Sequence, residues 1–541
     1  MKRLVSLLFS LILILNPSAR ADEGMWLPIL IKQLNIKKMH EMGLNLSAEE
    51  IYSINRSSLK DAIPIFGGGC TSEIISDQGL LMTNLHCGYR QVQSHTTLEN
   101  DYLKNGFWAM TRGEELPNPG LSVTFLIRME DVTEKVLEGI NDKMPEEERG
   151  QKIRSISAVI ERDATDGTHY EAIVRSYYGG NQYYLLVFER YLDVRLVGAP
   201  PVSIGDFGSL TDNWMWPRHK ADFALFRVYM SPDGKPAEYA PENIPLKPKH
   251  YLPVSNKGIE KGDFAMIMGY PGSTNRYMTS YGIKELMEVT HPNRIKIRGE
   301  KLILMNEDMN SDPEIRIQYA AKYKGASNYW KYSIGQTQGL KRLKVLEKKI
   351  TIEEKFREWI NADPERKAKY GEALDLIEKS YTGRREFNHA YQYLRECLLS
   401  GSELISFAAN AGQLIDLLEA EEPDQSRLER TLSNLGSRAD RFFRDYNPPT
   451  DKKITHALFK MYMEDISDEF YPESFSIITE EYQGDISHFI DDLFSQSMFA
   501  DQSRFDDFIK EPDAEMLKKD LAVRMALPIF IKNMELRQKN N

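Results

Sequence analysis

The spacing of apolar residues changes near residue 280, and the change predicts two kinds of structure in one chain. From residue 66 to residue 275 the apolar residues form short runs rich in Val, Ile, Phe and Tyr, which is typical of β-strands. After residue 281 they recur at spacings of three and four with charged residues between them, which indicates amphipathic helices. A β region followed by a large helical region is the simplest architecture.

In the β region, strands are expected where an apolar run is flanked by turn residues. These runs are Thr71 to Ile75, Leu80 to Asn84, Leu121 to Arg128, Tyr170 to Tyr178, Tyr183 to Val194, Phe223 to Tyr229 and Phe264 to Met268. Asp77-Gln78-Gly79 separates the first two runs and predicts a hairpin turn. Helices are expected within 22–50 and from Pro145 to about Arg162, where acidic residues fill the first turn.

In the helical region, apolar residues at helical spacing predict a succession of helices. They are expected at Ile283 to Met305, Leu340 to Ile360, Ala373 to Ser380, Tyr391 to Leu399, Leu404 to Leu418, 424–444, 452–468, 484–496 and 514–538. At 541 residues the chain is long enough for two or more domains.

The N-terminus has the pattern of a signal peptide over residues 1–21. Lys2 and Arg3 precede an apolar run from Leu4 to Leu15, and Ala19-Arg20-Ala21 fits a cleavage site. The run is shorter than the roughly 20 residues that a membrane span needs, so secretion is predicted and no membrane span is expected. The net charge is -11 without a basic block, which argues against nucleic-acid binding.

The chain has three cysteines, Cys70, Cys87 and Cys397. In an oxidising compartment the two that are close in sequence, Cys70 and Cys87, are the natural disulfide pair. Cys397 lies in a helical pattern and is expected to be a small buried apolar residue. No metal and no cofactor is predicted, because neither His-Glu-x-x-His nor paired Cys-x-x-Cys occurs.

His86 and Asp222 are the candidates for acid–base chemistry. His86 follows an apolar strand and precedes Cys87, a setting similar to that of the general base in trypsin-like serine peptidases. Asp222 begins another apolar strand, where a carboxylate needs a partner such as a histidine ring N–H. A structural histidine, and an aspartate that caps a strand beside Arg218 or Lys220, remain the alternatives. His219 is a weaker rival for His86.

No serine has the Gly-x-Ser-Gly setting that would provide a nucleophile with an oxyanion hole. Pro271-Gly272-Ser273-Thr274 lacks the second glycine, and Gly325-Ala326-Ser327 is no better. Ser400-Gly401-Ser402 lies between two helical patterns. None of these serines is nominated.

The chain resembles the bacterial dipeptidyl-peptidase 7 and dipeptidyl-peptidase 11 family of serine exopeptidases in motifs spread over most of its length. The matching stretches are Asp22-Glu23-Gly24-Met25-Trp26, Gly67-Gly68-Gly69-Cys70-Thr71, Thr83-Asn84-Leu85-His86-Cys87-Gly88, Asp212-Asn213-Trp214-Met215-Trp216-Pro217-Arg218-His219, Gly269-Tyr270-Pro271-Gly272 and Ser327-Asn328-Tyr329-Trp330-Lys331. The tryptophan-rich stretch is the most specific of them.

The resemblance implies a hydrolase that releases dipeptides from the free N-termini of oligopeptides, in the periplasm or at the cell surface of a Gram-negative bacterium. It implies a trypsin-like double β-barrel with a large helical insertion. The expected domains are a β-barrel peptidase region at 22–276 and a helical capping domain at 277–541. The oligomeric state is open, with a homodimer as one alternative.

The resemblance also assigns roles to residues of this chain. His86 would be the general base and Asp222 its orienting carboxylate. Asn213, Trp214 and Asn328 match the positions that bind the substrate's α-amino group. Taken without the resemblance, Asn213 and Asn328 are better explained by turn and helix-cap chemistry.

The chain departs from the family pattern at its end. Family members continue into a segment that carries the serine in a Gly-Asn-Ser-Gly-Ser sequence, and this sequence stops at Asn541. The expectation is therefore a chain without the nucleophile, with an incomplete second barrel and no activity alone. The alternatives are a non-catalytic periplasmic peptide-binding protein, and an assembly completed by a second chain.

Overall fold

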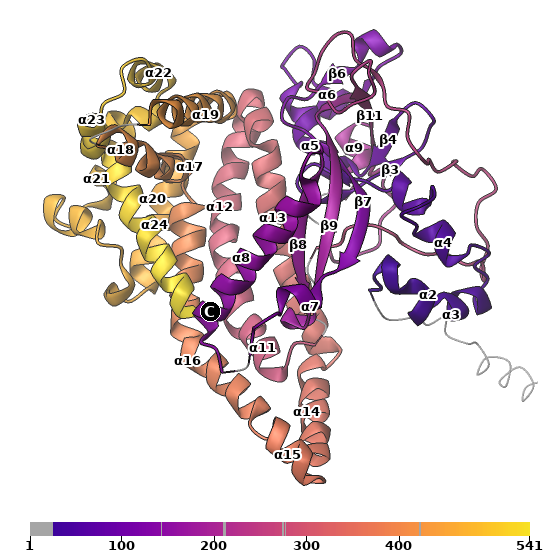
Figure 1. Ribbon diagram of the computed structural model, residues 1–541. Coiled ribbons are helices and arrows are strands. Elements are labelled where there is room, and N and C mark those ends of the chain that lie inside the picture. The colour runs from indigo at the N-terminus through magenta and orange to yellow at the C-terminus, as the bar shows by residue number, and fades with distance from the viewer. Residues whose placement is uncertain are drawn as a thin grey trace, which may run out of the picture. The chain divides into compact units, whose positions relative to one another are not determined.

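The computed structural model describes residues 25–141, 143–208, 213–272, 275, 277–420 and 424–540 (Figure 1). The expected signal peptide lies outside them. The chain forms two compact units, here called the strand-rich unit and the helical unit. The strand-rich unit comprises the chain up to Thr83, Pro117–Leu196 and Leu225–Pro271, and the helical unit comprises Asn84–Leu116, Val197–Ala224 and the chain from Gly272 onward.

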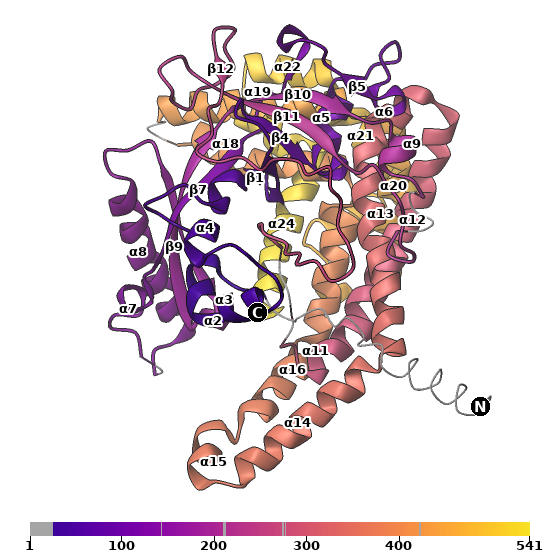
Figure 2. The same ribbon diagram turned by 90° about the vertical axis from the view of Figure 1, so that its right-hand side faces the viewer.

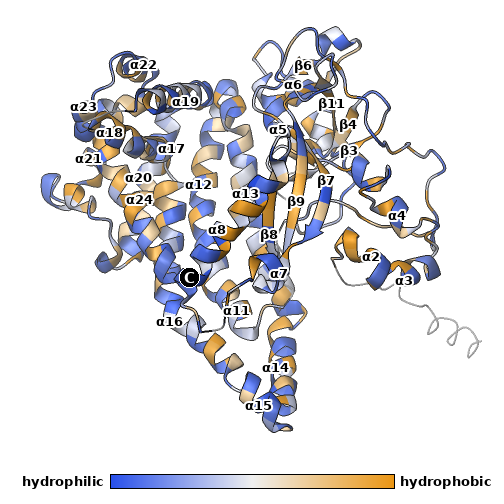
Figure 3. Ribbon diagram, viewed as in Figure 1, coloured by the Kyte–Doolittle hydropathy of each residue, from blue (hydrophilic) through white to orange (hydrophobic). Residues whose placement is uncertain are grey.

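A five-stranded antiparallel sheet forms much of the strand-rich unit. Its order is β2 (Cys70–Thr71), β1 (Ile65–Phe66), β7 (Val123–Asp131), β9 (Gln182–Tyr191) and β8 (Glu171–Tyr177). Helix α8 (Glu146–Thr165) packs Ile153 and Ile160 against the apolar side chains of this sheet. Strand β9 is predominantly hydrophobic, because both of its faces are covered (Figure 3).

A second sheet has seven strands. Its main path is β3 (Glu73–Ile74), β4 (Leu80–Thr83), β11 (Ala224–Met230), β10 (Asp193–Ala199) and β5 (Phe107–Trp108), with β12 (Ile244–Pro245) on β11 and β6 (Leu116–Pro117) on β10. The predicted hairpin is confirmed, since Glu73 pairs with Met82. Its turn needs Gly79, because φ is +66° and a Cβ there would lie 2.8 Å from the Val228 carbonyl oxygen.

Two strand predictions need correction. The run from Tyr183 to Val194 is divided between β9 and β10, so it is not one strand. The run from Phe264 to Met268 forms no strand at all. Phe264 and Met268 instead pack their side chains on a cluster of the short N-terminal helices, so their apolar character reflects that contact and not a sheet.

The N-terminal segment is helical, as the sequence predicted. It contains the 3-10 helix Pro28–Leu30, α2 (Ile31–Leu34), α3 (Ile36–Glu41) and α4 (Ala48–Ile51). Ser47 and Glu50 form a capping box that begins α4, in which each side chain bonds the other residue's backbone N–H.

The helical unit contains most of the helices. They are α5 (Leu85–Ser94), α6 (Tyr102–Asn105), α9 (Val202–Gly205), α11 (Ser280–Glu285), α12 (His291–Ser311), α13 (Pro313–Arg342), α14 (Val345–Asn361), α15 (Pro364–Tyr370), α16 (Ala373–Tyr393), α17 (Glu403–Ala408), α18 (Gly412–Leu418), α19 (Gln425–Arg444), α20 (Pro448–Asp465), α21 (Ile486–Gln496), α22 (Gln502–Lys510), α23 (Ala514–Lys519) and α24 (Leu521–Asn540). Helices α12 and α13 lie side by side (Figure 2). No helix in the described ranges is both long and apolar enough to cross a bilayer.

The predicted change from strands to helices near residue 280 is confirmed, with differences in detail. The run Leu340 to Ile360 is divided between α13 and α14, and the run Leu404 to Leu418 is divided between α17 and α18. The runs Ala373 to Ser380 and Tyr391 to Leu399, predicted as two helices, lie in one helical stretch that begins with α16. Helices α13 and α22 were not predicted as separate elements. The expected helix at 514–538 is interrupted at Asp520, whose carboxylate accepts hydrogen bonds from the backbone N–H groups of Met498 and Ala522. That carboxylate begins α24, so the chain must turn there.

The helical core is a continuous apolar cluster contributed by α12, α13 and α16 to α24. Cys397 is fully buried within it, and burial raises the pKa of its thiol well above the ordinary value. The expectation that Cys397 is a small buried residue is therefore confirmed. Cys397 lies in a π-helical segment, Leu394–Leu399, which ends beside Gly401.

Gly401 gives a test of this packing. A Cβ there would lie 1.9 Å from the Cys397 carbonyl oxygen and 2.7 Å from Leu458 Cδ1, so Gly401→Ala must displace the core. We expect it to lower the free energy of unfolding by about 2 kcal/mol or more, measured by urea denaturation. Gly436→Ala in α19 is the control, since no atom lies within 4 Å of its Cβ position. Equal effects of the two substitutions would contradict the packing.

Candidate active site

His86 lies in the first turn of α5, three residues after the end of β4. The sequence predicted the strand that precedes His86, but it did not predict the helix that carries His86. Asn84 is the last extended residue and the N-cap of α5, and the helical conformation starts at Leu85. The Asn84 side chain donates a hydrogen bond of 3.0 Å to the main-chain carbonyl of Asp222. The backbone before His86 is thereby tied to the segment that carries its partner.

The Asp222 carboxylate meets His86 twice. His86 Nδ1 lies 3.0 Å from Asp222 Oδ2, and the His86 backbone N–H donates to Oδ1 over 3.1 Å. Because a carboxylate only accepts hydrogen bonds, Nδ1 carries the proton in this contact and Nε2 is the basic nitrogen. The His86 side chain is 51% exposed and that of Asp222 only 19%. The ring is thus held from its buried side.

The pKa of the Asp222 carboxyl reflects this contact. Partial burial alone would raise it, but hydrogen bonds from the ring and backbone of His86, together with the charge of Lys220, hold the pKa well below its usual range. Lys220 Nζ lies 3.2 Å from Asp222 Oδ2. Asp222 is therefore paired both with His86 and with Lys220, the lysine that the sequence offered as an alternative partner. It is therefore ionised at neutral pH.

The segment before Asp222 approaches α5 closely. Gly205, at the end of α9, lies against Leu85, and a Cβ on it would be 2.3 Å from Leu85 Cδ2. The backbone N–H of Ala221 donates to the Ile204 carbonyl over 3.0 Å. These contacts fix the approach of residue 222 to residue 86. His219, the weaker rival, is exposed on the same segment.

Asn213, Trp214 and Asn328 are brought together from a loop and from the middle of α13. Asn328 Oδ1 accepts a hydrogen bond of 3.1 Å from Asn213 Nδ2 and one of 3.0 Å from Trp214 Nε1. Arg218 donates to Asn213 Oδ1 over 3.1 Å. The three residues are 115 positions apart in sequence at the widest, so their meeting is a property of the fold. The result is a cluster of oriented amide oxygens.

Trp214 takes a strained backbone conformation at this cluster. Its φ is +63°, which is rare for a residue with a bulky side chain and costs of the order of 1 kcal/mol or more. The Tyr332 ring packs edge-to-face against its indole, with an angle of 70° between the rings and ring centroids 5.1 Å apart. Gly335 of α13 leaves room for it, since a Cβ there would lie 3.3 Å from both the Trp214 Cβ and its carbonyl oxygen. Sequence reasoning missed Tyr332 and Gly335, because no motif marks them.

Ser327 and Ser402, two of the serines considered from sequence, have partners other than His86. Ser402 is fully buried and begins α17, where its hydroxyl accepts from the Ile405 N–H. Ser327 is buried in α13 and donates to the Lys324 carbonyl. Ser273 lies outside the described residues. Cys70 and Cys87 are disulfide-bonded, as predicted. Among the described residues, no cluster of His, Cys, Asp and Glu is arranged to hold a metal.

Comparison with known proteins identifies the family. The model of Peptidase S46 matches residues 21–541. This chain belongs to the peptidase S46 family. An Asp/Glu-specific dipeptidyl-peptidase of Flavobacterium psychrophilum is 40% identical to it over 95% of this chain and 70% of its own length. A dipeptidyl-peptidase 7 of Porphyromonas gingivalis is 39% identical over 98% of this chain and 74% of its own length.

Solved structures of the S46 family show the same fold. The crystal structure of Porphyromonas endodontalis DPP11 in complex with the dipeptide Arg-Glu matches with a TM-score of 0.84 and 36% identity. The match covers 96% of this chain and 74% of that one. The complex of the same protein with Arg-Asp matches equally well. The family resemblance drawn from the motifs is thereby confirmed.

Gly335 allows a test of the geometry around Trp214. We expect Gly335→Ala to displace Trp214, because the new Cβ would meet its backbone, and so to break the bond from the indole N–H to Asn328. The measurement is the indole N–H resonance of Trp214 in selectively labelled protein. Gly339→Ala, about one turn further along α13, is the matched control, since nothing lies within 4 Å of its Cβ position. A resonance unchanged by both substitutions would contradict this arrangement.

Proposed function

We propose that this chain provides the general-base half of a serine-type dipeptidyl aminopeptidase, which releases dipeptides from the N-termini of oligopeptides. The observation that carries the proposal is the His86–Asp222 pair, with Nδ1 bonded to the carboxylate and Nε2 directed away from it. The family supports it, because the S46 relatives described above are named as dipeptidyl-peptidases.

In the proposed reaction, Nε2 of His86 removes the proton of a serine hydroxyl as that oxygen attacks the scissile carbonyl carbon. The imidazolium that forms is stabilised by the ionised Asp222 carboxylate, and it then returns the proton to the leaving amine. Water repeats the cycle to release the dipeptide from the acyl-enzyme. Asp222 stays ionised throughout, in keeping with its lowered pKa.

The cluster of Asn213, Trp214 and Asn328 is proposed to bind the substrate's α-ammonium group. Amide oxygens accept hydrogen bonds from such a group, and the indole face attracts a cation. Trp214 is 57% exposed, so its ring is open to a ligand. An exopeptidase must fix the free N-terminus at a set distance from the bond it cleaves, and this cluster belongs to the same compact unit as His86 and Asp222.

The serine nucleophile is proposed to come from a part of the family sequence that these 541 residues do not include. The relatives from Flavobacterium and Porphyromonas are matched over 70% and 74% of their length, so each has further sequence. In the described part of this chain, His86 Nε2 has no hydroxyl partner. The 541 residues alone are therefore proposed to be inactive.

The remaining family features are proposed with the function. The strands of region 22–276 would belong to a trypsin-like double barrel, with 277–541 as a helical capping domain. The protein would act after secretion across the inner membrane, in the periplasm or at the surface of a Gram-negative cell, with a homodimer as one form. No nucleic acid, metal or cofactor takes part.

Activity is the first test. We expect the 541-residue chain to release no fluorophore from dipeptidyl substrates, and turnover to appear when the unmatched segment of the Flavobacterium relative is supplied in fusion or as a second chain. In that active form His86→Ala should abolish turnover, and Asp222→Asn should lower it by about 10⁴-fold, because the amide favours the wrong ring tautomer. An N-acetylated substrate, which has no ammonium group, is the matched negative control.

Either of two results would contradict the proposal. Turnover by the 541 residues alone that disappears in His86→Ala would place the nucleophile within this chain. A complemented chain that binds free-amine peptides but never cleaves them would favour the non-catalytic peptide-binding protein.

Binding of the amine is tested without turnover. Asn328→Ala removes the acceptor that holds the Asn213 amide and the Trp214 indole in place, so we expect it to weaken the binding of a free-amine tetrapeptide about tenfold. Asn328→Asp keeps the acceptor and adds a negative charge, so it should bind at least as tightly as the wild type. Affinities are measured by calorimetry, with the N-acetylated peptide as the control. If the cluster has no such role, the free-amine peptide will bind all three proteins equally well.

A further inference from the structure

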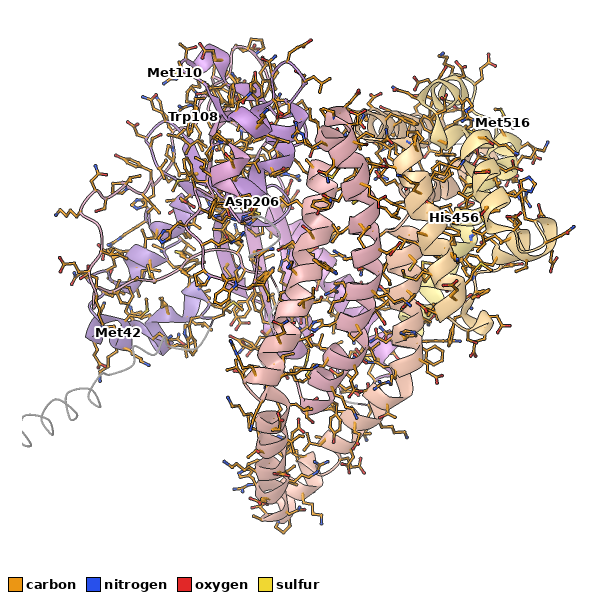
Figure 4. The ribbon with its side chains drawn as sticks, turned by 180° about the vertical axis from the view of Figure 1, so that it is seen from behind. Met42, Trp108, Met110, Asp206, His456 and Met516 are labelled. Carbon is orange, nitrogen blue, oxygen red and sulfur yellow. The ribbon has the colours of Figure 1, made fainter. Side chains whose placement is uncertain are left out.

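A chain of alternating charges runs from Asp222 to α13 within the helical unit. Lys220 Nζ lies between two carboxylates, 3.2 Å from Asp222 Oδ2 and 3.1 Å from Asp206 Oδ1. On its other side, Asp206 Oδ2 lies 3.3 Å from Lys324 Nζ of α13. Asp206 is labelled in Figure 4. The four charges sum to zero, so the group can be partly buried without an uncompensated ion.

These side chains are well shielded from solvent. Lys220 and Asp206 are each 17% exposed, Asp222 is 19% exposed and Lys324 is 23% exposed. Ion pairs at this depth are screened much less than surface pairs, so they hold their members in fixed positions. Exposed pairs are commonly mobile and contribute little. This group is therefore suited to fixing geometry.

Lys220 determines how the Asp222 carboxylate is oriented. Oδ1 receives the backbone N–H of His86, while Oδ2 receives both the His86 ring and the Lys220 ammonium. Without Lys220, the bonds to His86 alone would hold the carboxylate, and rotation about its χ2 would carry Oδ2 away from the ring. With Lys220, rotation breaks an ion pair as well as a hydrogen bond.

Lys324 anchors the group to α13. Its Nζ is buried beside Asp206 as an ion pair without a well-directed hydrogen bond, and it lies 4.3 Å from the centre of the Tyr89 ring. Burial lowers the pKa of this ammonium, while Asp206 opposes that effect. Asn328 follows four residues later on the same helix, so Lys324 and Asn328 share one face. One rigid helix therefore contacts both the charge group and the amine cluster.

We propose that Lys220 is a positioning residue for the general-base pair, held by Asp206 and Lys324. It keeps Asp222 Oδ2 directed at His86 Nδ1 and so fixes the Nδ1–H tautomer that leaves Nε2 as the base. Asp206 and Lys324 also fix the position of this pair relative to the cluster of Asn213, Trp214 and Asn328. This inference rests on the proposed function for its catalytic meaning, but the geometry it describes is measurable without turnover.

The test uses the whole 541-residue chain with ¹⁵N-labelled histidine, studied by NMR at a pH of about 8, where an imidazole is ordinarily neutral. In the wild type, the two ring nitrogens of His86 should give well-separated signals, one protonated and one not. In Lys220→Met we expect the signals to move toward each other, because the tautomers begin to exchange. Lys220→Arg, which keeps the charge and the donors, should restore the separation.

The controls separate positioning from loss of stability. Lys322 lies on α13, the helix that carries Lys324, and its side chain is 25% exposed and pairs with Glu403. Lys322→Met should leave the His86 signals unchanged. If Lys220→Met does not fold, Asp206→Asn is used in its place. In Asp206→Asn we expect the two His86 nitrogen signals to move toward each other by a smaller amount. In the complemented, active protein, Lys220→Met should lower kcat at least tenfold, with KM within about twofold of the wild type.

His86 signals that are identical in wild type, Lys220→Met and Asp206→Asn would overturn the inference. So would a kcat in the complemented protein that does not change. Failure of the proposed function looks different: the complemented protein would not cleave dipeptidyl substrates, while the His86 signals would still depend on Lys220.

Discussion

The two-point contact between Asp222 and His86 is the constraint on which the site depends. It requires the start of α5 and the segment before β11 to approach within hydrogen-bonding distance, although the two residues are 136 positions apart. Several local features serve this approach. Asn84 ends β4 and bonds the Asp222 carbonyl, and Gly205 removes the Cβ that would collide with Leu85. The geometry of one carboxylate thus explains residues that have no chemistry of their own.

A carboxylate in this position carries an energetic cost that the structure must offset. Burial opposes ionisation of Asp222, and the hydrogen bonds from His86 and the charge of Lys220 more than compensate for it. Lys220 is shared between the carboxylates of Asp222 and Asp206, and the second charge that Asp206 adds is balanced by Lys324. Buried charges are costly unless paired, so each member of the group requires the next. The last of these pairs, between Asp206 and Lys324, links the charges of the site to α13.

The parts of the site that the sequence predicted are those with a local signal. His86 and the cysteine pair are marked by a short motif, and Asp222 is marked by its place before an apolar strand. The strand before His86 was predicted, but helix α5, which begins directly after Asn84, was not. Only one partner of Asp222 in the charge group could be predicted. Lys220 is a neighbour of Asp222 in sequence, whereas Asp206 and Lys324 are brought to it only by the fold.

Helix α13 shows why the rest was not predictable. The period of apolar residues is the main signal for a helix, but the buried positions of α13 include Ala326, Ser327 and Ser333 as well as larger side chains. These small and polar residues weaken the periodicity, and they are present where the helix approaches α12 closely. The same helix carries Lys324 toward the charge group and Asn328 toward Trp214. Its surface is therefore determined by polar partners that are distant in sequence, and a helix of this kind leaves little trace in the hydrophobic pattern.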